Sequence, residues 1–174
     1  MLRVFPVAGR SQFADTWGAA RDQGRQHEGT DIFAAEGTPV LAVSDGQARK
    51  GNDPLGGQVV TLTDSDARWY YAHLSGWEGE FPRAVKAGDV LGYVGTTGNA
   101  AGKSPHLHFG KYVGTEAQNP FAELTAARLV TAPAPAPSSS SSSSPSTKGM
   151  AGALLALFVL YSLSSTRTAR RAYG

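Results

Sequence analysis

The sequence predicts a mainly β protein: a compact antiparallel sheet or sandwich domain, followed by a disordered linker and one apolar C-terminal helix. From Gly37 onward, short apolar runs alternate with Gly, Asp and Asn at roughly ten-residue spacing, which is typical of sandwiches and barrels. The chain also contains 21 glycines, many of them in turn-like clusters. An abrupt change of composition after residue 130 separates this domain from the rest of the chain.

The individual elements follow from the apolar runs and from the turn signals between them. Residues 5–26 read as a loop, with a short helical turn near residues 11–19. Five strands are expected after this loop, at residues 39–43, 58–63, 69–74, 90–94 and 106–112. The turn signal Asp64-Ser65-Asp66 makes the second and third of these strands a hairpin, and Lys86-Ala87-Gly88-Asp89 is expected to form a tight turn.

Residues 131–147 have the composition of a disordered linker. They contain three Ala-Pro pairs, seven consecutive serines and Pro145. Such a segment has too little apolar surface to offset the entropy lost on ordering. We therefore expect a domain at residues 1–130, a linker at 131–147 and a separate C-terminal segment at 148–174.

The C-terminal segment contains an apolar stretch that predicts a membrane anchor. Residues 150–163 carry no charge, and a helix over residues 149–166 would be about 27 Å long. That length is near the lower limit for crossing a bilayer core of about 30 Å. Packing of this helix on the domain or on a partner is the alternative. Three arginines follow the stretch and one lysine precedes it, so the positive-inside rule places the domain outside the cytoplasm.

The beginning of the chain does not explain how the domain would cross a membrane. Residues 1–6 have no basic region that leads into an apolar stretch, so no N-terminal signal peptide is predicted.

Charge and cysteine content exclude several classes of function. Residues 1–130 hold 12 of the 16 Lys and Arg and all 14 Asp and Glu, so this part is slightly acidic. The remaining four basic residues lie in the C-terminal segment, and we expect no nucleic-acid partner. There is no cysteine, which excludes disulfides and thiolate metal sites.

All four histidines fall in three short motifs. These are His27-Glu28-Gly29-Thr30-Asp31, Tyr71-Ala72-His73-Leu74 and His106-Leu107-His108-Phe109. Because side chains alternate along a strand, His106 and His108 are expected on one face, with Leu107 and Phe109 toward the core. Imidazole and carboxylate are ligands that zinc accepts.

Taken singly, each motif leaves a simpler interpretation open. Asp31 could cap a turn, and His73 could be a hydrogen-bonded structural histidine. His106 and His108 could bind one metal together, or one could bind metal while the other transfers protons.

The order of the three motifs resembles the zinc metallopeptidases of the lysostaphin/LytM type, peptidase family M23. Segments outside the three motifs also resemble that family: Phe5-Pro6-Val7, Gly37-Thr38-Pro39-Val40, Gly56-Gly57-Gln58-Val59-Val60, Gly95-Thr96-Thr97-Gly98-Asn99-Ala100 and Asn119-Pro120. The resemblance covers nearly the whole of residues 1–130 and implies a LytM-like fold of the duplicated-hybrid-motif type, with an open groove. One departure is Gly110, where many relatives carry an acidic residue.

The resemblance also implies a function and a set of site residues. His27, Asp31 and His108 would bind one Zn²⁺ per chain, and His73 and His106 would be catalytic without binding the metal. The chain would be a zinc-dependent endopeptidase that hydrolyses peptide cross-links or stem peptides of bacterial peptidoglycan. The glycine-dense stretches 51–57 and 95–102 are expected to form the groove walls, with Trp17, Tyr71 and Tyr112 as candidate lining aromatics.

Three alternatives are weighed against this interpretation. A non-haem iron oxygenase also uses two histidines and one carboxylate, but this hypothesis assigns no role to His73 and His106. A carrier domain of the lipoyl or biotinyl type would need an exposed turn lysine, and Lys86 lacks the usual surroundings. A catalytically silent peptidoglycan-binding or regulatory module on the same fold is the remaining alternative.

The predicted location combines the anchor with the substrate. We expect a membrane-associated protein whose domain faces the cell wall, with the lipid bilayer contacted through residues 149–166. A phage-encoded protein would instead lie in a virion membrane.

Overall fold

A computed structural model describes residues 1–131 of the 174-residue chain, and side chains as far as Arg128. Apart from residue 131, the predicted linker lies outside this range, as do the predicted C-terminal helix and its expected bilayer contact. Within residues 1–131, no helix has both the length and the apolar character needed to cross a membrane.

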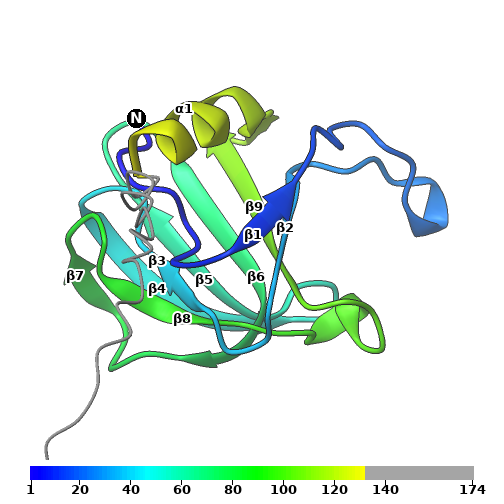
Figure 1. The fold of residues 1–174 in the computed structure, drawn as a ribbon, viewed down its shortest axis with the longest axis horizontal. Coiled ribbons are helices and arrows are strands. Elements are labelled where there is room, and N and C mark those ends of the chain that lie inside the picture. The colour runs from blue at the N-terminus through cyan, green and yellow to red at the C-terminus, as the bar shows by residue number, and fades with distance from the viewer. Residues whose placement is uncertain (132–174) are drawn as a thin grey trace, which may run out of the picture. The chain divides into compact units, whose positions relative to one another are not determined.

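The described residues form a mainly antiparallel β domain with one α-helix, as the sequence predicts (Figure 1). The strands are β1 (Ser11–Phe13), β2 (Thr30–Ala34), β3 (Pro39–Leu41), β4 (Gly46–Asp53), β5 (Gly57–Thr63), β6 (Arg68–Trp77), β7 (Arg83–Val85), β8 (Val90–Val94), β9 (His106–Val113) and β10 (Glu116–Gln118). The short 3₁₀ turns are η1 (Asp22–Gly24) and η2 (Gly98–Ala100), and the helix is α1 (Phe121–Thr131).

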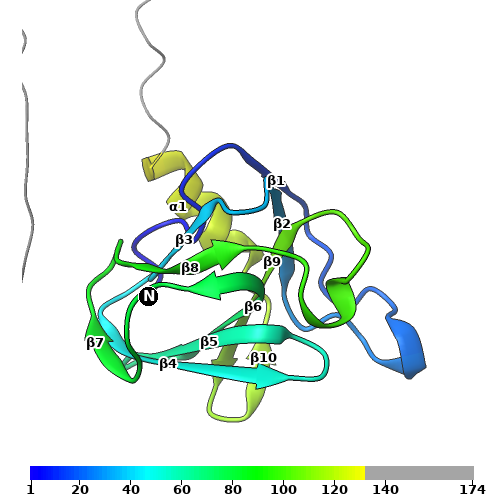
Figure 2. The same cartoon turned by 90° about the horizontal axis from the view of Figure 1, so that it is seen from below.

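The strands run in the order β1-β2-β9-β6-β5-β4-β7, with β10 paired to β9 and the β3–β8 pair joined through β6 (Figure 2). All of these pairings are antiparallel. The predicted hairpin of β5 and β6 is confirmed by five register pairs from Gln58↔Leu74 to Thr63↔Arg68. The predicted turn before β8 is confirmed as well, because the Asp89 amide donates to the Lys86 carbonyl oxygen at 3.0 Å.

The main core lies on one side of β6 and β9. Leu107 and Phe109 are fully buried there, as the alternation along β9 predicts. The Phe109 ring stacks on Trp69 at 5.7 Å between centroids and meets the edge of Tyr71 at 5.2 Å. His106 and His108, which alternate with Leu107 and Phe109 along β9, therefore lie on the opposite face of the sheet.

The prediction of a helical turn near residues 11–19 is wrong. Ser11–Phe13 forms the edge strand β1 instead and pairs with Ile32–Ala34 of β2. Phe13 packs against Phe5 and Phe121, and these tertiary contacts stabilise the extended conformation of the segment. Arg128 of α1 donates to the Ser11 hydroxyl and carbonyl oxygens at 2.6 and 3.0 Å, so the helix covers this sheet edge.

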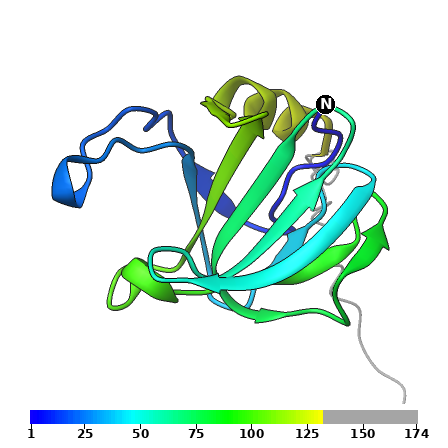
Figure 3. The same cartoon turned by 180° about the vertical axis from the view of Figure 1, so that it is seen from behind.

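Two connections project from the same side of the sheet. The β1–β2 connection, drawn in blue, extends away from the strands, and the β8–β9 connection with η2, drawn in green, projects to the same side (Figures 1 and 3). Backbone hydrogen bonds tie the first of these into a hairpin over residues 16–27, hereafter the 16–27 hairpin.

The predicted turn at Asp64 is built by the side chain of that residue. Its carboxylate accepts hydrogen bonds from the amides of Asp66 and Ala67, from the Ser44 hydroxyl and from Trp69 Nε1. Burial acts to raise the pKa of Asp64, but these hydrogen bonds outweigh burial and lower the pKa to about 2.

We predict that Asp64→Asn weakens the pH dependence of stability. The folded pKa is lower than the unfolded value of about 3.9, so ionised Asp64 stabilises the fold above about pH 4, and this contribution is lost as the pH falls toward 2. The variant should be about 1–3 kcal/mol less stable near neutral pH, because buried donors lose their charged acceptor. Thermal unfolding of metal-free protein measures both effects. An Asn variant with the same slope of Tm against pH as the wild type would contradict this role.

Candidate metal centre and active-site cavity

The pairing of β2 with β9 brings two of the predicted metal ligands together. Asp31 lies directly opposite His108 in this antiparallel register, and Ile32 lies opposite Leu107. Residues opposite each other on a sheet share a face. Burial of Ile32 and Leu107 in the core therefore directs Asp31 and His108 to the other side.

His27 reaches the same point from the end of the 16–27 hairpin. Its backbone amide donates to the Ala19 carbonyl oxygen, and its Nδ1 lies 3.0 Å from the Thr16 carbonyl oxygen. A carbonyl oxygen only accepts, so Nδ1 carries the proton and Nε2 presents a lone pair to the site.

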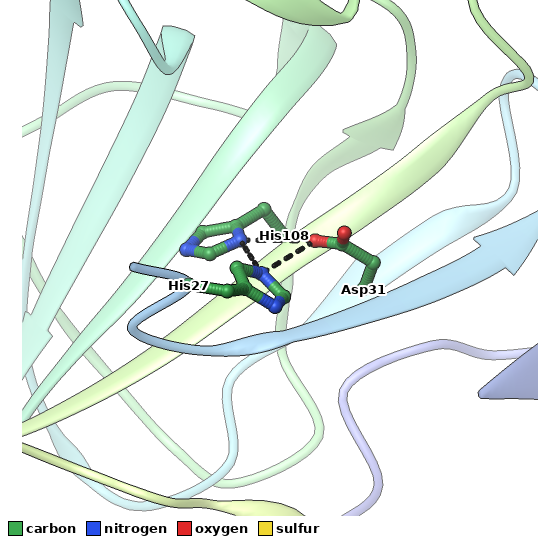
Figure 4. Close-up of side chains that lie close together, drawn as sticks. All are labelled: His27, Asp31 and His108. Atoms are coloured by element: carbon green, nitrogen blue, oxygen red, sulfur yellow. Dashed lines mark hydrogen bonds and ion pairs between the residues drawn. The ribbon is translucent and has the colours of Figure 1, made fainter. Parts of the chain in front are cut away.

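The three candidate ligand atoms converge (Figure 4). His27 Nε2 lies 2.9 Å from His108 Nδ1 and 3.1 Å from Asp31 Oδ1, and His108 Nδ1 lies 3.0 Å from Asp31 Oδ1. A single proton on His108 can satisfy only one of these three contacts, which leaves lone pairs facing one another. A cation would satisfy all three, and the nitrogen–nitrogen–oxygen donor set suits zinc.

Asp31 also contacts a residue that the sequence analysis missed. Arg21 Nη2 donates to Asp31 Oδ2 at 2.6 Å. Burial acts to raise the pKa of Asp31, but the contacts of its carboxylate with the His108 and His27 rings outweigh burial, so the pKa lies far below its usual range. Asp31 is thus an anion in the folded protein.

His73 and His106 lie beside this cluster. Their ring centroids are 4.9 Å apart, and the His73 ring lies 6.0 Å from that of His108. His73 Nδ1 faces the Thr97 carbonyl oxygen at 2.9 Å, and His106 Nδ1 faces the Ser104 carbonyl oxygen at 2.8 Å. In both rings Nδ1 is therefore the donor, and Nε2 is left for other partners.

The backbone at His73 is unusual for a residue inside a strand. Its φ of 66° lies in the left-handed region, at a shift of register between β5 and β6. Such a conformation costs on the order of 1–3 kcal/mol and occurs most often at functional sites. Burial, together with the charges of His106 and His108, lowers the pKa of His73 to about 4, against the opposing effect of the Thr97 carbonyl.

These residues line a cavity of about 940 Å³. Both glycine-dense stretches contribute to its walls, Leu55 and Gly56 from one and Asn99 and Ala100 from the other. Of the three aromatic candidates, Tyr112 lines the cavity, whereas Tyr71 is fully buried in the core and Trp17 does not line it. Tyr70, which the sequence analysis did not single out, lines the cavity instead.

Gly110 lies on the cavity side of β9, opposite Tyr70. A Cβ at this position would lie 3.2 Å from the Tyr112 ring and 3.4 Å from the Glu28 carbonyl oxygen. A side chain at position 110 would therefore affect the part of the cavity beside Tyr70 and Tyr112 and not the three-ligand cluster.

Comparison with protein-family models identifies the family to which this chain belongs. The model of peptidase family M23 matches residues 25–120, more than half of the chain and all five predicted site residues. The chain belongs to peptidase family M23. It is thus a member of a family of peptidoglycan endopeptidases, as the resemblance of its motifs predicts.

Individual M23 relatives agree with this assignment. The chain is 40% identical over 122 residues to an L-Ala–D-Glu endopeptidase of Bacillus subtilis, covering 63% of this chain and 37% of that protein. It is 36% identical over 112 residues to lysostaphin of Staphylococcus simulans, covering 60% of this chain and 22% of that protein. The chain therefore spans well under half the length of these relatives.

Solved peptidase structures share the fold. The catalytic domain of lysostaphin from Staphylococcus simulans matches with a TM-score of 0.60 and 32% identity, over 66% of this chain and 92% of that domain. A zinc-containing peptidase from Vibrio cholerae matches with a TM-score of 0.59 and 26% identity, over 67% of this chain and 38% of that one.

We predict that Gly29→Ala impairs metal binding. A Cβ at Gly29 would lie 2.7 Å from both His108 Cε1 and the Phe109 carbonyl oxygen, so the His108 ring must move. Overpacking of this kind costs about 1–3 kcal/mol, which corresponds to roughly a tenfold to hundredfold loss of Zn²⁺ affinity. Competition with a chromophoric chelator measures the affinity.

Gly51→Ala is the matched control for this change. Its Cβ would make an ordinary contact of 3.5 Å with Val59, on a strand away from the ligands. Equal zinc affinities of the two variants would show that the space at Gly29 is not needed by His108.

Proposed function

We propose that this M23 chain is a zinc-dependent endopeptidase that hydrolyses peptide bonds in the cross-links or stem peptides of bacterial peptidoglycan. The convergence of His27 Nε2, Asp31 Oδ1 and His108 Nδ1 within 2.9–3.1 Å carries this proposal. The related endopeptidases from Bacillus subtilis and Staphylococcus capitis, named for L-Ala–D-Glu and glycyl-glycine bonds, support peptidoglycan as the substrate class.

His27, Asp31 and His108 would hold one Zn²⁺. Bound zinc polarises a scissile carbonyl and acidifies a water molecule. The protein's contribution is to present three donors from two adjacent strands and one hairpin, with the His27 tautomer fixed by the Thr16 carbonyl oxygen.

His73 and His106 would transfer protons: Nε2 of each ring would accept a proton and, once protonated, donate a hydrogen bond to the developing oxyanion. In both residues a backbone carbonyl holds Nδ1–H, so Nε2 is the atom available to the substrate. Both side chains line the cavity beside the ligand cluster. The scissile peptide would lie between them and the cluster, in the groove whose walls include Leu55 and Asn99.

Digestion of purified sacculi by the 174-residue chain tests the proposal. We expect peptide fragments to be released with Zn²⁺ and not with a chelator, and their masses identify the bond. If Zn²⁺ but not Fe²⁺ restores the activity of the metal-free protein, the protein is a zinc enzyme and not an iron enzyme. Zinc binding without release from several wall types would favour the catalytically silent binding module.

Substitution of single histidines should separate the two groups of residues. We predict that His108→Ala abolishes both zinc binding and hydrolysis. His106→Ala should retain most of the zinc but lower the hydrolysis rate by about 10²–10⁴-fold, the usual contribution of a proton-transfer group. Metal content by elemental analysis and fragment release from sacculi provide the two readouts. A fully active His106→Ala variant would disprove the role assigned to that residue.

We further propose, from the sequence alone, that residues 149–166 attach the chain to a lipid bilayer with the domain facing the cell wall, or to a virion membrane if it is phage-encoded. Co-sedimentation of the whole chain with lipid vesicles, compared with a chain that ends at residue 148, tests this attachment.

A further inference from the structure

The two carboxylate oxygens of Asp31 have different partners. Oδ1 faces the two imidazole nitrogens at 3.0 and 3.1 Å, whereas Oδ2 accepts from Arg21 Nη2 at 2.6 Å. The Asp31 side chain is 14% exposed and the Arg21 side chain 36% exposed, so the carboxylate end of this ion pair is the end that is shielded from water. The carboxylate is therefore oriented by two sets of partners on opposite sides.

Arg21 is itself held by the element that supplies His27. The Arg21 amide donates to the Arg25 carbonyl oxygen at 2.9 Å, and Ala20 bridges to Gln26 across the 16–27 hairpin. One hairpin thus delivers His27 at its end and the Arg21 guanidinium along its length. Both side chains line the same cavity.

A carboxylate can bind a metal through one oxygen or through both. An arginine that holds one oxygen through a charge-assisted hydrogen bond leaves the other to the metal. Outer partners of this kind orient metal ligands, and their removal typically costs 10–100-fold in metal affinity.

We propose that Arg21 is the positioning residue of the metal centre: it occupies Asp31 Oδ2 so that Asp31 contributes Oδ1 alone. This inference rests on the proposed function, because it assumes that the His27, Asp31 and His108 cluster binds a divalent metal. It assigns to Arg21 no contact with the substrate.

The test compares wild type, Arg21→Gln and Arg21→Lys in the 174-residue chain. Zn²⁺ affinity is measured by chelator competition, and Co²⁺ is used as a spectroscopic probe whose visible absorption weakens as coordination rises above four. We expect Arg21→Gln to bind Zn²⁺ about 10–100-fold more weakly and to give the weaker Co²⁺ spectrum of a five-coordinate site. Arg21→Lys should restore part of both, because it returns one charged donor.

Arg3→Gln is the matched control, since it removes an Arg–Asp pair at the surface, with Asp45 at 3.7 Å. It should change neither the affinity nor the spectrum. Thermal unfolding of the metal-free variants reports any loss of folding. If Arg21→Gln lowers the Tm but leaves the Co²⁺ spectrum and Zn²⁺ affinity as in wild type, Arg21 only stabilises the hairpin, and the proposal is wrong.

Failure of the inference is distinguishable from failure of the proposed function. A wild-type chain that binds no Zn²⁺ refutes the metal centre itself. A wild-type chain that binds Zn²⁺, with an Arg21→Gln variant that binds it equally well and with the same spectrum, refutes only the role of Arg21.

Discussion

The site depends on the antiparallel register of β2 and β9. That register places Asp31 opposite His108 and, one residue further, Ile32 opposite Leu107. A shift by one residue would turn every side chain of a strand to the other face. It would therefore bury the two ligands and expose the two apolar residues. The free energy gained by burying Ile32 and Leu107 thus fixes the positions of the two candidate metal ligands, Asp31 and His108, so the same strand pairing specifies the core and the site.

Backbone carbonyl groups control the chemistry of the histidines. The carbonyl oxygens of Thr16, Thr97 and Ser104 accept from Nδ1 of His27, His73 and His106 respectively. In each ring Nε2 is left for the cavity, so three of the four imidazoles have the same tautomer. His108 differs, because its Nδ1 faces the ligand cluster. The connections around the sheet therefore determine which nitrogen is protonated in these three rings, whereas β6 and β9 position the rings of His73, His106 and His108.

The regular part of this arrangement could be predicted from the sequence, and the irregular part could not. Alternation along His106–Val113 predicts the two faces of β9, and the Asp64 turn predicts the β5–β6 hairpin. Strand β4 escaped prediction because its only fully buried side chain is Ala48 in a polar run. Helix α1 had a usable signal in Asn119, whose side chain accepts from the Phe121 amide, followed by Pro120. No sequence signal pointed to Arg21, because its ion pair with Asp31 depends on the tertiary placement of the 16–27 hairpin.

The features that are costly for folding are concentrated around one cavity. They include the left-handed backbone at His73, the ionised and largely buried Asp31, and ligand lone pairs within 3.1 Å of one another. A sheet with an apolar core on its other face can sustain such costs, which would destabilise an isolated loop. A ligand that binds only the folded state adds stability in proportion to the logarithm of its concentration over its dissociation constant. A metal bound to the cluster would therefore relieve the repulsion among its ligands and stabilise the β2–β9 pairing that assembles them.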